Sequence, residues 1–382
     1  MSSRRPVFAV VHNIPSPYRL HLFRVLKEEL GRHQIELHVH FMARGHADRG
    51  HWADERVADF PHTYWSDAGI RLGRKKWHLN PGLLARLARE PPAFLMVGGP
   101  WDSLTGVLAS FLASRSVSIA WFEGNTRSPG RVRGVVRSLK EGLLRRFDFV
   151  AVPGEEGAGL AELIAGQRVR RRLALLPNLV DESRFSGQES KVGEMRSTLG
   201  VGRHERLAVW PARLIPEKGV VPFLTALDRS DLIGWRIVVL GDGPLRSQVE
   251  RTIALRGLAD SVRVLSPQPY EKMPATYAAA DLFVLPSLSD PNPLSVVEAM
   301  HSGLPLVVSD RIGNLPEALR VGENGWALDP ESSESIRAVL GKALRTPDET
   351  LRAMGRRSKE LAVASWSSGP AVARFVATVV GP

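Results

Sequence analysis

The stretch DLFVLPSLSDPNPLSVVEAMHSGLPLVVSD (residues 281–310) joins two apolar runs through a segment of different periodicity. DLFVLPS and LPLVVSD have the length and the β-branched content of buried strands. Residues 294–302 between them have helical spacing, and Gly303 predicts the end of that helix. Two buried strands joined by a helix are typical of a parallel sheet, because parallel neighbours need a crossover connection.

The same alternation extends over the whole chain. Helix-like runs at residues 17–30, 81–89, 102–113 and 131–146 separate the strand-like runs PVFAVVHN, QIELHVHFMA, AFLMVGG, SVSIAWFEG, DFVAVPG and LALLPN. The pattern restarts after residue 205 with RLAVWPAR, WRIVVLGDGP and VRVLSP. We therefore predict an α/β protein with two doubly wound Rossmann-like domains that face each other across a cleft.

The predicted domain organisation follows from this restart. An N-terminal Rossmann-like domain is expected over residues 1–185 and a C-terminal one over residues 186–365, with the polar segment 185–206 as a linker. The apolar spacing near the end predicts a helix within residues 366–382 that packs back on the N-terminal domain. Two domains also agree with a length of 382 residues, which exceeds what a single core usually supports.

Composition limits the class of protein. The chain has no Cys, so disulfides, thiolate metal sites and a Cys nucleophile are excluded, and a cytoplasmic location is expected. The first apolar run is too short for a secretory signal. The longest apolar region, residues 93–113, is interrupted by Gly98, Gly99, Pro100 and Asp102, so no membrane span is predicted.

Positive charge is concentrated in the first half of the chain. Residues 1–185 contain 28 Lys or Arg and 18 Asp or Glu, and thus most of the formal net charge of +11. The basic clusters at residues 71–76 and 168–172 could meet RNA, anionic lipid or a charged acceptor, or could be a solvated Arg-rich surface. No aromatic-interleaved basic motif accompanies them, so nucleic acid is not an expected partner.

Ligands of open parallel sheets bind beyond the carboxyl ends of the strands, which directs attention to the loops there. These loops contain no P-loop, and GDGPLR lacks the third glycine of a dinucleotide fingerprint. Neither an HExxH motif nor another strong metal-binding pattern occurs, so no metal site is predicted.

In the stretch quoted first, the residues before the helix predict an anion site. Asn292 fits the N-cap position and Pro293 the first helical position. The amides of Leu294 and Ser295 would then be among the unpaired donors of the first turn, and with the helix dipole they would attract an anion.

Two carboxylates flank that turn. Glu298 lies on the same helical face and is suited to accept hydrogen bonds from a vicinal diol such as a ribose, and Asp290 could reach a second polyol. The alternative interpretation is a capping box formed by Ser295 and Glu298, with Asp290 as a solvated loop residue.

A second segment, WPARLIPEKGV, carries two cations after a strand. Arg213 and Lys218 flank Pro216 at a helix start, where a guanidinium and an ammonium could hold a diphosphate between two helix N-termini. Alternatively, they are unremarkable surface cations.

Taken together, these segments resemble the retaining glycosyltransferases of the GT-B fold, family 4, whose C-terminal domain is called glycosyl transferases group 1. The resemblance covers most of residues 173–330 and rests on LPNLVD (176–181), PARLIPEKGV (211–220), LGDGP (240–244), the stretch 281–310 and NGWALD (324–329). It implies that Arg213 and Lys218 bind the donor diphosphate, that Glu298 binds the ribose, and that Asp290 contacts sugar hydroxyls. The other donor-binding positions that it implies are Gly241, Asp242, Gly243, Asn292, Pro293, Leu294 and Ser295.

The chain also departs from the family pattern. Asp290 stands where the family commonly has Glu, and Asn292-Pro293 stand where it has Phe-Gly. The first loop, NIPSPYRLHLF, lacks the Gly-Gly of many members and is similar to a group with Pro-Tyr-Arg there. Glu123 stands where many relatives have a His near the reacting sugar, so it is predicted to orient hydroxyls or to be a satisfied rim carboxylate. The expected acceptor-binding residues are Asn13, Ser16, Tyr18, Arg19, Trp101 and Asp102.

The functional prediction is a retaining transfer of a sugar from a nucleotide diphosphate sugar to an acceptor hydroxyl, without a cofactor or a metal. The acceptor would be a sugar, a lipid-linked molecule or a small molecule, in polysaccharide, glycolipid or glycosylated metabolite biosynthesis. Peripheral contact of the basic N-terminal domain with the inner face of the membrane is a further hypothesis. The alternatives are a nucleotide-sugar epimerase or hydrolase of the same fold, and a noncatalytic module that binds RNA or a membrane surface.

Overall fold

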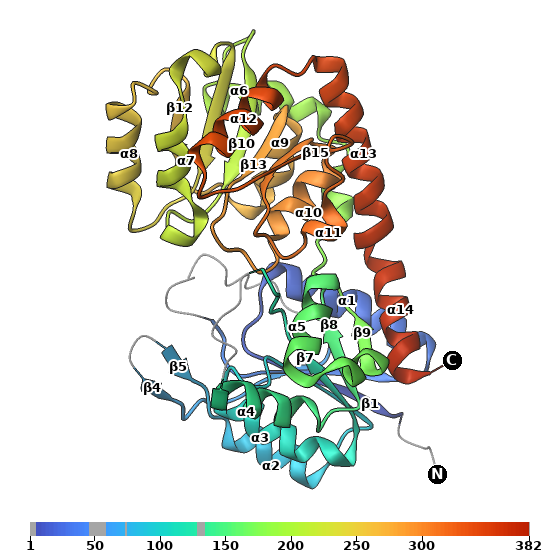
Figure 1. Ribbon diagram of the computed structural model, residues 1–382. Coiled ribbons are helices and arrows are strands. Elements are labelled where there is room, and N and C mark those ends of the chain that lie inside the picture. Colours follow the sequence, from blue (N-terminus) through green and yellow to red (C-terminus); the bar gives the residue numbers. More distant parts are fainter. Residues whose placement is uncertain (1–4, 46–58, 73–74, 128–133, 382) are drawn as a thin grey trace. The chain divides into compact units, whose positions relative to one another are not determined.

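The computed structural model describes residues 5–45, 59–72, 75–127 and 134–381, and it divides the chain into two compact units. Unit 1 consists of Met1–Val180 together with Ser368–Pro382, and unit 2 of Asp181–Ser367. The chain thus leaves unit 1 at Val180, where the sequence prediction has residue 185. It returns at Ser368, where the prediction has residue 366. Figure 1 shows the two groups of strands and helices.

Unit 1 is built on a seven-stranded parallel sheet in the order β3-β2-β1-β6-β7-β8-β9. The order reverses at the β1–β6 pair, so the loops after these two strands diverge at the carboxyl edge, where such sheets bind ligands. The strands are β1 (Val7–His12), β2 (Glu36–Phe41), β3 (His62–Tyr64), β6 (Phe94–Gly98), β7 (Val117–Trp121), β8 (Phe149–Val152) and β9 (Leu173–Leu175). The helices are α1 (Pro17–Arg32), α2 (Pro81–Arg89), α3 (Leu104–Leu112), α4 (Gly134–Leu144), α5 (Glu155–Ala165) and α14 (Ser368–Val380).

The last helix, α14, completes unit 1. Its apolar side buries Phe375 and Val376 against α1 and β9, and each such side chain contributes about 1.5–3 kcal/mol when it is removed from water. At its first residue, Ser368 Oγ lies 2.8 Å from His21 Nε2 and donates to the carbonyl of Val180 at 3.2 Å. The start of α14 is therefore fixed beside the residue at which the chain leaves unit 1.

A small antiparallel hairpin of unit 1 follows β3. Strands β4 (Ile70–Leu72) and β5 (Lys75–Trp77) pair Ile70 with Trp77 and Leu72 with Lys75. The basic cluster at residues 71–76 falls on this hairpin, although residues 73–74 lie outside the described part. The second cluster, at residues 168–172, lies in a 3-10 helix, Gln167–Arg172, before β9.

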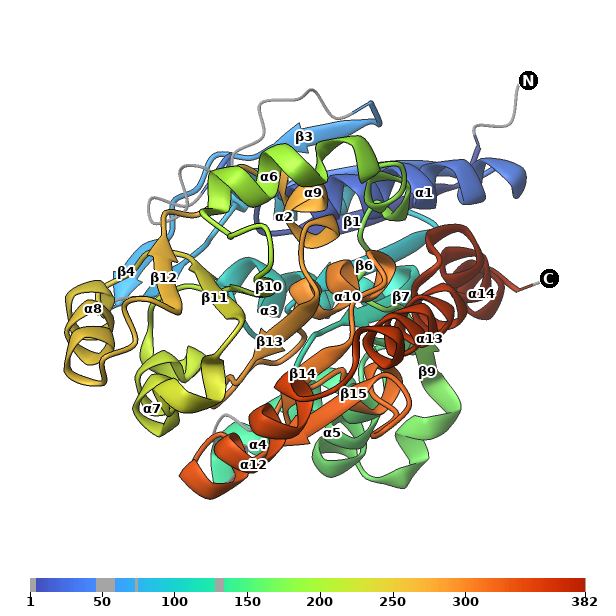
Figure 2. The same ribbon diagram turned by 90° about the horizontal axis from the view of Figure 1, so that it is seen from above.

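Unit 2 has a six-stranded parallel sheet in the order β12-β11-β10-β13-β14-β15, again with a reversal, here beside β10 (Figure 2). Its strands are β10 (Arg206–Pro211), β11 (Trp235–Leu240), β12 (Val262–Leu265), β13 (Leu282–Leu285), β14 (Leu306–Ser309) and β15 (Gly325–Leu328). The α-helices are α6 (Val192–Leu199), α7 (Val220–Ala226), α8 (Arg246–Leu255), α9 (Met273–Ala278), α10 (Leu294–His301), α11 (Leu315–Ala318), α12 (Ser333–Leu344) and α13 (Asp348–Trp366). The 3-10 helices relevant to the site are η4 (Glu182–Phe185), η6 (Pro216–Lys218) and η8 (Tyr270–Lys272).

The segment predicted as a linker, residues 185–206, belongs to unit 2 and contains α6. This helix buries Met195 and Leu199, one turn apart, and ends at Gly200 in the left-handed conformation (φ 68°). Arg196 donates to the carbonyl of Ala279 at 2.8 Å and anchors the helix to α9. The linker prediction is therefore wrong. The segment is largely polar because its helix buries only two side chains, and this polar sequence is what suggests a linker.

In the described ranges every helix is too short or too polar to cross a membrane.

Candidate active site

The loops after β10 and β11 lie against each other at the carboxyl edge of unit 2. The amide of Leu214 donates to the carbonyl of Asp242 at 2.9 Å. A Cβ at Gly241 would lie 1.7 Å from the carbonyl oxygen of Ala212, so only glycine permits this approach of the two backbones. The exposed Arg213 projects from the loop thus fixed. The donor-binding roles of Gly241, Asp242 and Gly243 stay predictions, but the glycines already have a packing role.

The loop after β13 packs against the end of η6 and positions Lys218. Gly219 has φ 67°, and a Cβ there would lie 2.3 Å from the carbonyl oxygen of Pro286. The amide of Ser289 donates to the carbonyl of Glu217 at 3.1 Å. The Lys218 ammonium forms an ion pair with the Asp290 carboxylate, and the two side chains are 17% and 12% exposed. The sequence predicts that Lys218 binds phosphate and Asp290 binds sugar as separate groups, whereas the structure joins them in one partly buried pair.

Helix α10 begins at Leu294, and Pro293 occupies the N-cap position without a side-chain cap. The predicted N-cap, Asn292, is one residue too early because Pro293 has extended backbone angles (φ −69°, ψ 111°). Leu294 and Ser295 are the first two helical residues, so their amides belong to the helix turn that favours an anion, as predicted.

The loop after β14, which the sequence analysis does not include in the site, supports the start of α10. Gly313 donates from its amide to the carbonyl of Asp290 at 3.0 Å, and Asn314 Nδ2 donates to the carbonyl of Pro293 at 3.1 Å. The signal for these residues is present in the sequence, because Gly-Asn follows the buried strand β14 at the same edge as the predicted site.

Glu298 lies one turn into α10 and is bonded to a residue of α9. Tyr277, which is fully buried, donates from its hydroxyl to Glu298 Oε2 at 2.7 Å. Burial raises the pKa of Glu298 from 4.5 to about 7, and the hydrogen bond from Tyr277 and the charge of Arg184 oppose the rise. The capping-box alternative is wrong, since Ser295 lies inside the helix and the Glu298 carboxylate is bonded to Tyr277.

At the carboxyl edge of unit 1, Arg19 is 2% exposed and is bonded inside the protein. Its guanidinium donates to Asn178 Oδ1 at 3.0 Å, forms an ion pair with Glu123, and lies 4.3 Å from the centre of the Trp121 ring. This placement differs from the predicted acceptor contact, because a buried guanidinium with these partners holds Glu123 in position. Glu123 itself is 38% exposed and follows β7, as expected for a group at the rim.

The other predicted acceptor residues differ in exposure. Asn13 is exposed and accepts from the amide of Ile14 at 2.8 Å, whereas Ser16 is buried. Tyr18 is half-buried at the start of α1. Trp101 is half-buried and packs 5.2 Å from the ring of Phe122, and Asp102 is exposed. All follow β1 or β6 at the carboxyl edge, and their acceptor roles stay predictions.

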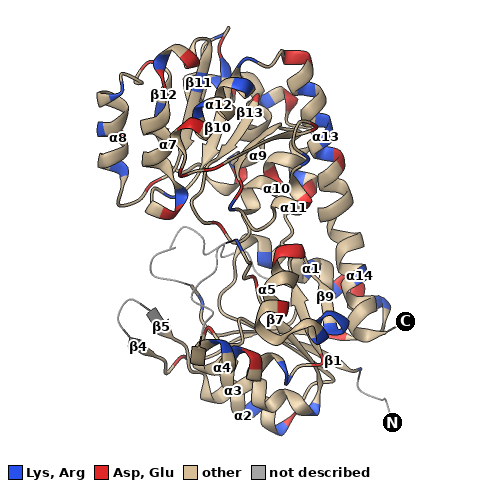
Figure 3. Cartoon of the chain, viewed as in Figure 1, with Lys and Arg blue, Asp and Glu red and all other residues tan. Residues whose placement is uncertain are grey.

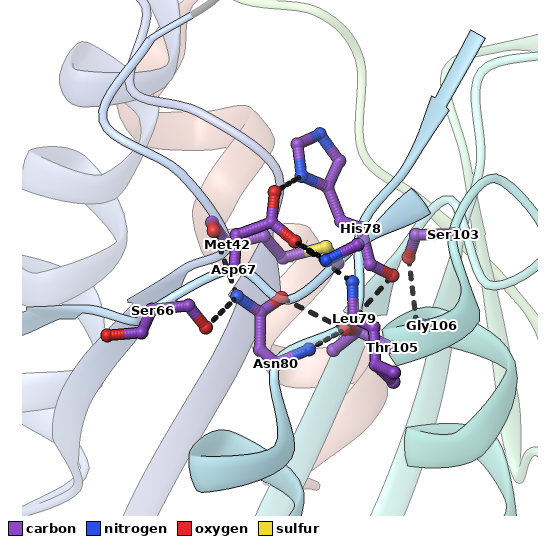
Figure 4. A network of polar contacts seen from close by, with 10 residues as sticks. Met42, Ser66, Asp67, His78, Leu79, Asn80, Ser103, Thr105 and Gly106 are labelled. Carbon is purple, nitrogen blue, oxygen red and sulfur yellow. Dashed lines mark hydrogen bonds and ion pairs between the residues drawn. The ribbon is translucent and has the colours of Figure 1, made fainter. Parts of the chain in front are cut away.

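A buried polar network beside this edge has no counterpart in the sequence analysis (Figure 4). Asn80 is fully buried, and its Nδ2 donates to the carbonyls of Met42 and Ser66, each at 3.0 Å. The hydroxyl of Thr105 donates to Asn80 Oδ1 at 2.9 Å. The loop that precedes α2 is thereby tied to the end of β2 and to α3.

The second part of the network fixes the base of the β4–β5 hairpin. Asp67 Oδ2 lies 2.7 Å from His78 Nδ1, and Asp67 Oδ1 accepts from the amides of Gly69 at 2.8 Å and Leu79 at 3.1 Å. One carboxylate thus bonds both ends of the hairpin, so the backbone on either side of β4 and β5 is held together.

Comparison with known proteins identifies this arrangement. Two doubly wound parallel sheets define the chain as a protein of the GT-B fold, and the crystal structure of Alr3699/HepE from Anabaena in complex with UDP is similar to it. That likeness has a TM-score of 0.76 at 18% identity and covers 98% of this chain and 99% of that chain. Residues 193–361, somewhat less than half of the chain, match the family model of glycosyl transferases group 1. The predicted fold class is confirmed, and the match agrees with the predicted resemblance to glycosyl transferases group 1, whereas the retaining mechanism stays a prediction.

Two curated relatives match this chain in part. Exopolysaccharide phosphotransferase SCO2592 of Streptomyces coelicolor is 32% identical over 264 residues, which are 68% of this chain and 26% of that protein. The GDP-mannose-dependent alpha-(1-6)-phosphatidylinositol monomannoside mannosyltransferase of Mycolicibacterium smegmatis is 30% identical over 200 residues, which are 50% of this chain and 52% of that protein. The chain therefore spans about a quarter of the length of the first relative and about half of the second.

Proposed function

We propose that the chain is a retaining glycosyltransferase that moves a sugar from a nucleotide diphosphate sugar to an acceptor hydroxyl. The observation that carries the proposal is the gathering of Arg213, the Lys218–Asp290 pair, the start of α10 and Glu298 in loops and helices at one sheet edge. Similarity to a structure with bound UDP and to a GDP-mannose-dependent enzyme supports a nucleoside diphosphate as the leaving group.

In the proposed reaction the acceptor oxygen bonds to the anomeric carbon on the face from which the diphosphate leaves. The bond between that carbon and the diphosphate oxygen breaks, and a phosphate oxygen of the leaving group takes the acceptor proton. The negative charge that develops on the diphosphate is stabilised by Arg213, Lys218 and the first amides of α10, which are already in place. This chemistry needs neither a metal nor a protein base, so we propose a metal-independent transfer.

Asp290 and Glu298 have different proposed tasks. Asp290 is 8% exposed and holds Lys218, so its free lone pairs accept from sugar hydroxyls while the pair keeps the ammonium at the sheet edge. Glu298 has one oxygen bonded to Tyr277 and offers the other to the ribose. Glu123, oriented by Arg19, is proposed to hold donor or acceptor hydroxyls.

The test compares Arg213→Ala with Arg203→Ala, which removes an exposed arginine before β10, at the opposite sheet edge. The full chain is screened against nucleotide diphosphate sugars by thermal shift, and transfer to sugar and lipid acceptors is followed by product analysis. Arg213→Ala is expected to lower transfer by about two orders of magnitude, and Arg203→Ala to leave it unchanged. Equal turnover in both variants contradicts the proposed role. Release of free sugar or of an epimerised donor without any acceptor would instead identify a hydrolase or an epimerase.

The surface of unit 1 supports a further part of the proposal, a cytoplasmic enzyme in peripheral contact with an anionic membrane. On α4, Val135 and Leu139 are 76% and 64% exposed, and on α3 Phe111 is 51% exposed. Arg137 lies among the exposed residues of α4, and the Arg146 guanidinium lies 4.1 Å from the centre of the Phe111 ring. Figure 3 shows Lys and Arg on α4. Apolar and basic side chains on one exposed helix suit an anionic lipid surface and a lipid-linked acceptor.

Cosedimentation tests this contact with vesicles of phosphatidylcholine alone and with added phosphatidylglycerol. Val135→Ser with Leu139→Ser should abolish binding to the anionic vesicles. The control pair Ile233→Ser with Leu255→Ser removes unit 2 side chains that are 82% and 86% exposed, and it should leave binding unchanged. Binding to RNA in place of vesicles, lost steeply with salt, would favour a nucleic-acid module.

A further inference from the structure

We propose that Tyr277 and Arg184 are positioning residues that hold Glu298 as an ionised acceptor for the 2′- and 3′-hydroxyls of a ribose, so that the site selects ribonucleotide over 2′-deoxyribonucleotide donors. The inference rests on the proposed function and adds two residues and a selectivity to it. Neither residue is among the positions predicted from the sequence.

Tyr277 fixes one oxygen of Glu298. Its ring is fully buried between Phe185 and Phe283, with ring centres 6.1 and 6.2 Å away, so the hydroxyl has little freedom. This hydroxyl donates to Glu298 Oε2 at 2.7 Å. Within the described ranges Glu298 Oε1 accepts no hydrogen bond from the protein. One oxygen is therefore oriented by the core, and the other is left for a ligand.

Arg184 supplies the positive charge. Its guanidinium stacks 3.7 Å from the centre of the Tyr270 ring and donates from Nη2 to the carbonyl of Tyr270 at 2.9 Å. Its Nη1 atom is buried and has no hydrogen-bond partner in the described part of the chain. No carboxylate there is within ion-pair distance of Arg184, so its field acts on Glu298 without local neutralisation. This charge lowers the pKa of Glu298 against the effect of burial.

The charge state of Glu298 decides what it can bind. An ionised carboxylate only accepts, which suits two ribose hydroxyls that both donate, whereas a protonated one must itself donate from one oxygen. The titratable and charged groups that face Glu298 are Tyr277 from α9, Tyr270 from η8 and Arg184 from η4. Loss of the Tyr277 hydroxyl removes a donor to the ionised form and should raise the pKa of Glu298 further. A rise of one unit would leave about one tenth of Glu298 ionised at pH 7 instead of one half, which weakens donor binding about fivefold.

The experiment measures the dissociation constant of the best donor of the thermal-shift screen and of its 2′-deoxy analogue by calorimetry between pH 5.5 and 9, on the full chain. A nucleotide diphosphate sugar is used because its phosphates do not titrate in this range. We expect wild-type affinity for the ribose form to fall below pH 7. Tyr277→Phe and Arg184→Gln should move the midpoint of this fall in affinity to higher pH. Both variants should recover most of the affinity at pH 9.

Two controls make the test specific. Glu298→Gln should bind with no pH dependence in this range and lose most of the preference for ribose, and Tyr64→Phe, the same change in β3 of unit 1, should behave as wild type. If Tyr277→Phe weakens donor binding equally at pH 6 and pH 9, Tyr277 has a packing role and the inference is overturned. Equal wild-type affinity for the donor and for its 2′-deoxy analogue would also overturn it. The transferase proposal survives those outcomes if sugar transfer is observed. Failure of the wild-type chain to bind any nucleotide sugar would overturn both.

Discussion

Replacement of Glu298 by Gln should stabilise unit 2 at high pH and not at low pH. The pKa of Glu298 is about 7 in the folded chain, and its ordinary value is 4.5. Because the folded state binds this proton more tightly, the stability that Glu298 contributes is fully present below pH 4.5 and is lost as the pH rises through 7. A difference of about 2.5 pKa units corresponds to about 3 kcal/mol. Gln keeps the shape and accepts from Tyr277, but it has no charge to bury.

Urea denaturation of wild type and Glu298→Gln at pH 5 and pH 9 measures this effect, since every other titrating group cancels in the difference between the two proteins. The variant should exceed wild type by less than about 1 kcal/mol at pH 5 and by about 3 kcal/mol at pH 9. A gain of the same size at both values of pH would refute the assignment of the cost to the ionised form of the half-buried Glu298. The variant should also bind donor more weakly, which would show that the cost is retained for function.

Three further outcomes follow from contacts at the two sheet edges. Lys218→Ala leaves the Asp290 side chain, which is 12% exposed, without its counter-ion and should lower the free energy of unfolding by about 3 kcal/mol. Arg213→Ala should change it by less than about 0.5 kcal/mol, and equal losses in urea melts would contradict the pairing. Gly241→Ala places a Cβ 1.7 Å from the Ala212 oxygen and should lower the free energy of unfolding by more than about 3 kcal/mol. The control Gly142→Ala in α4, where a Cβ has nothing within 4 Å, should be neutral or stabilising by up to about 1 kcal/mol. A mild effect at Gly241 would show that the two loops can separate. Asn80→Ala removes three buried hydrogen bonds and should cost about 2–4 kcal/mol, and a thermal melt close to wild type would show that the network is dispensable.

The sequence predicts the parallel sheets well because a strand buried on both faces leaves a continuous apolar run. VFAVV in β1 and IVVL in β11 are such runs. Elements that bury little do not carry this signal. Helix α6, in which Met195 and Leu199 are the buried residues, is an example.

For the candidate site, too, one part can be predicted from the sequence and another cannot. The rule that ligands bind at the carboxyl edge of parallel strands is enough to select Arg213, Lys218, Asp290 and Glu298. It does not show which of them meet. Lys218 and Asp290 are 72 residues apart in the sequence, and the partner of Glu298 is a tyrosine on another helix. Such pairs depend on how the loops pack, and a single sequence carries no periodic signal for them.

Because α14 is separated from the rest of unit 1 by all of unit 2, the order of synthesis matters for this chain. The apolar surface of α1 and β9 that α14 covers is made early, but its cover leaves the ribosome only after residues 181–367. During that interval the nascent chain carries an unfinished first unit while the second can already fold. Unit 1 can therefore be completed only after the whole of unit 2 has been synthesised, although it is begun first.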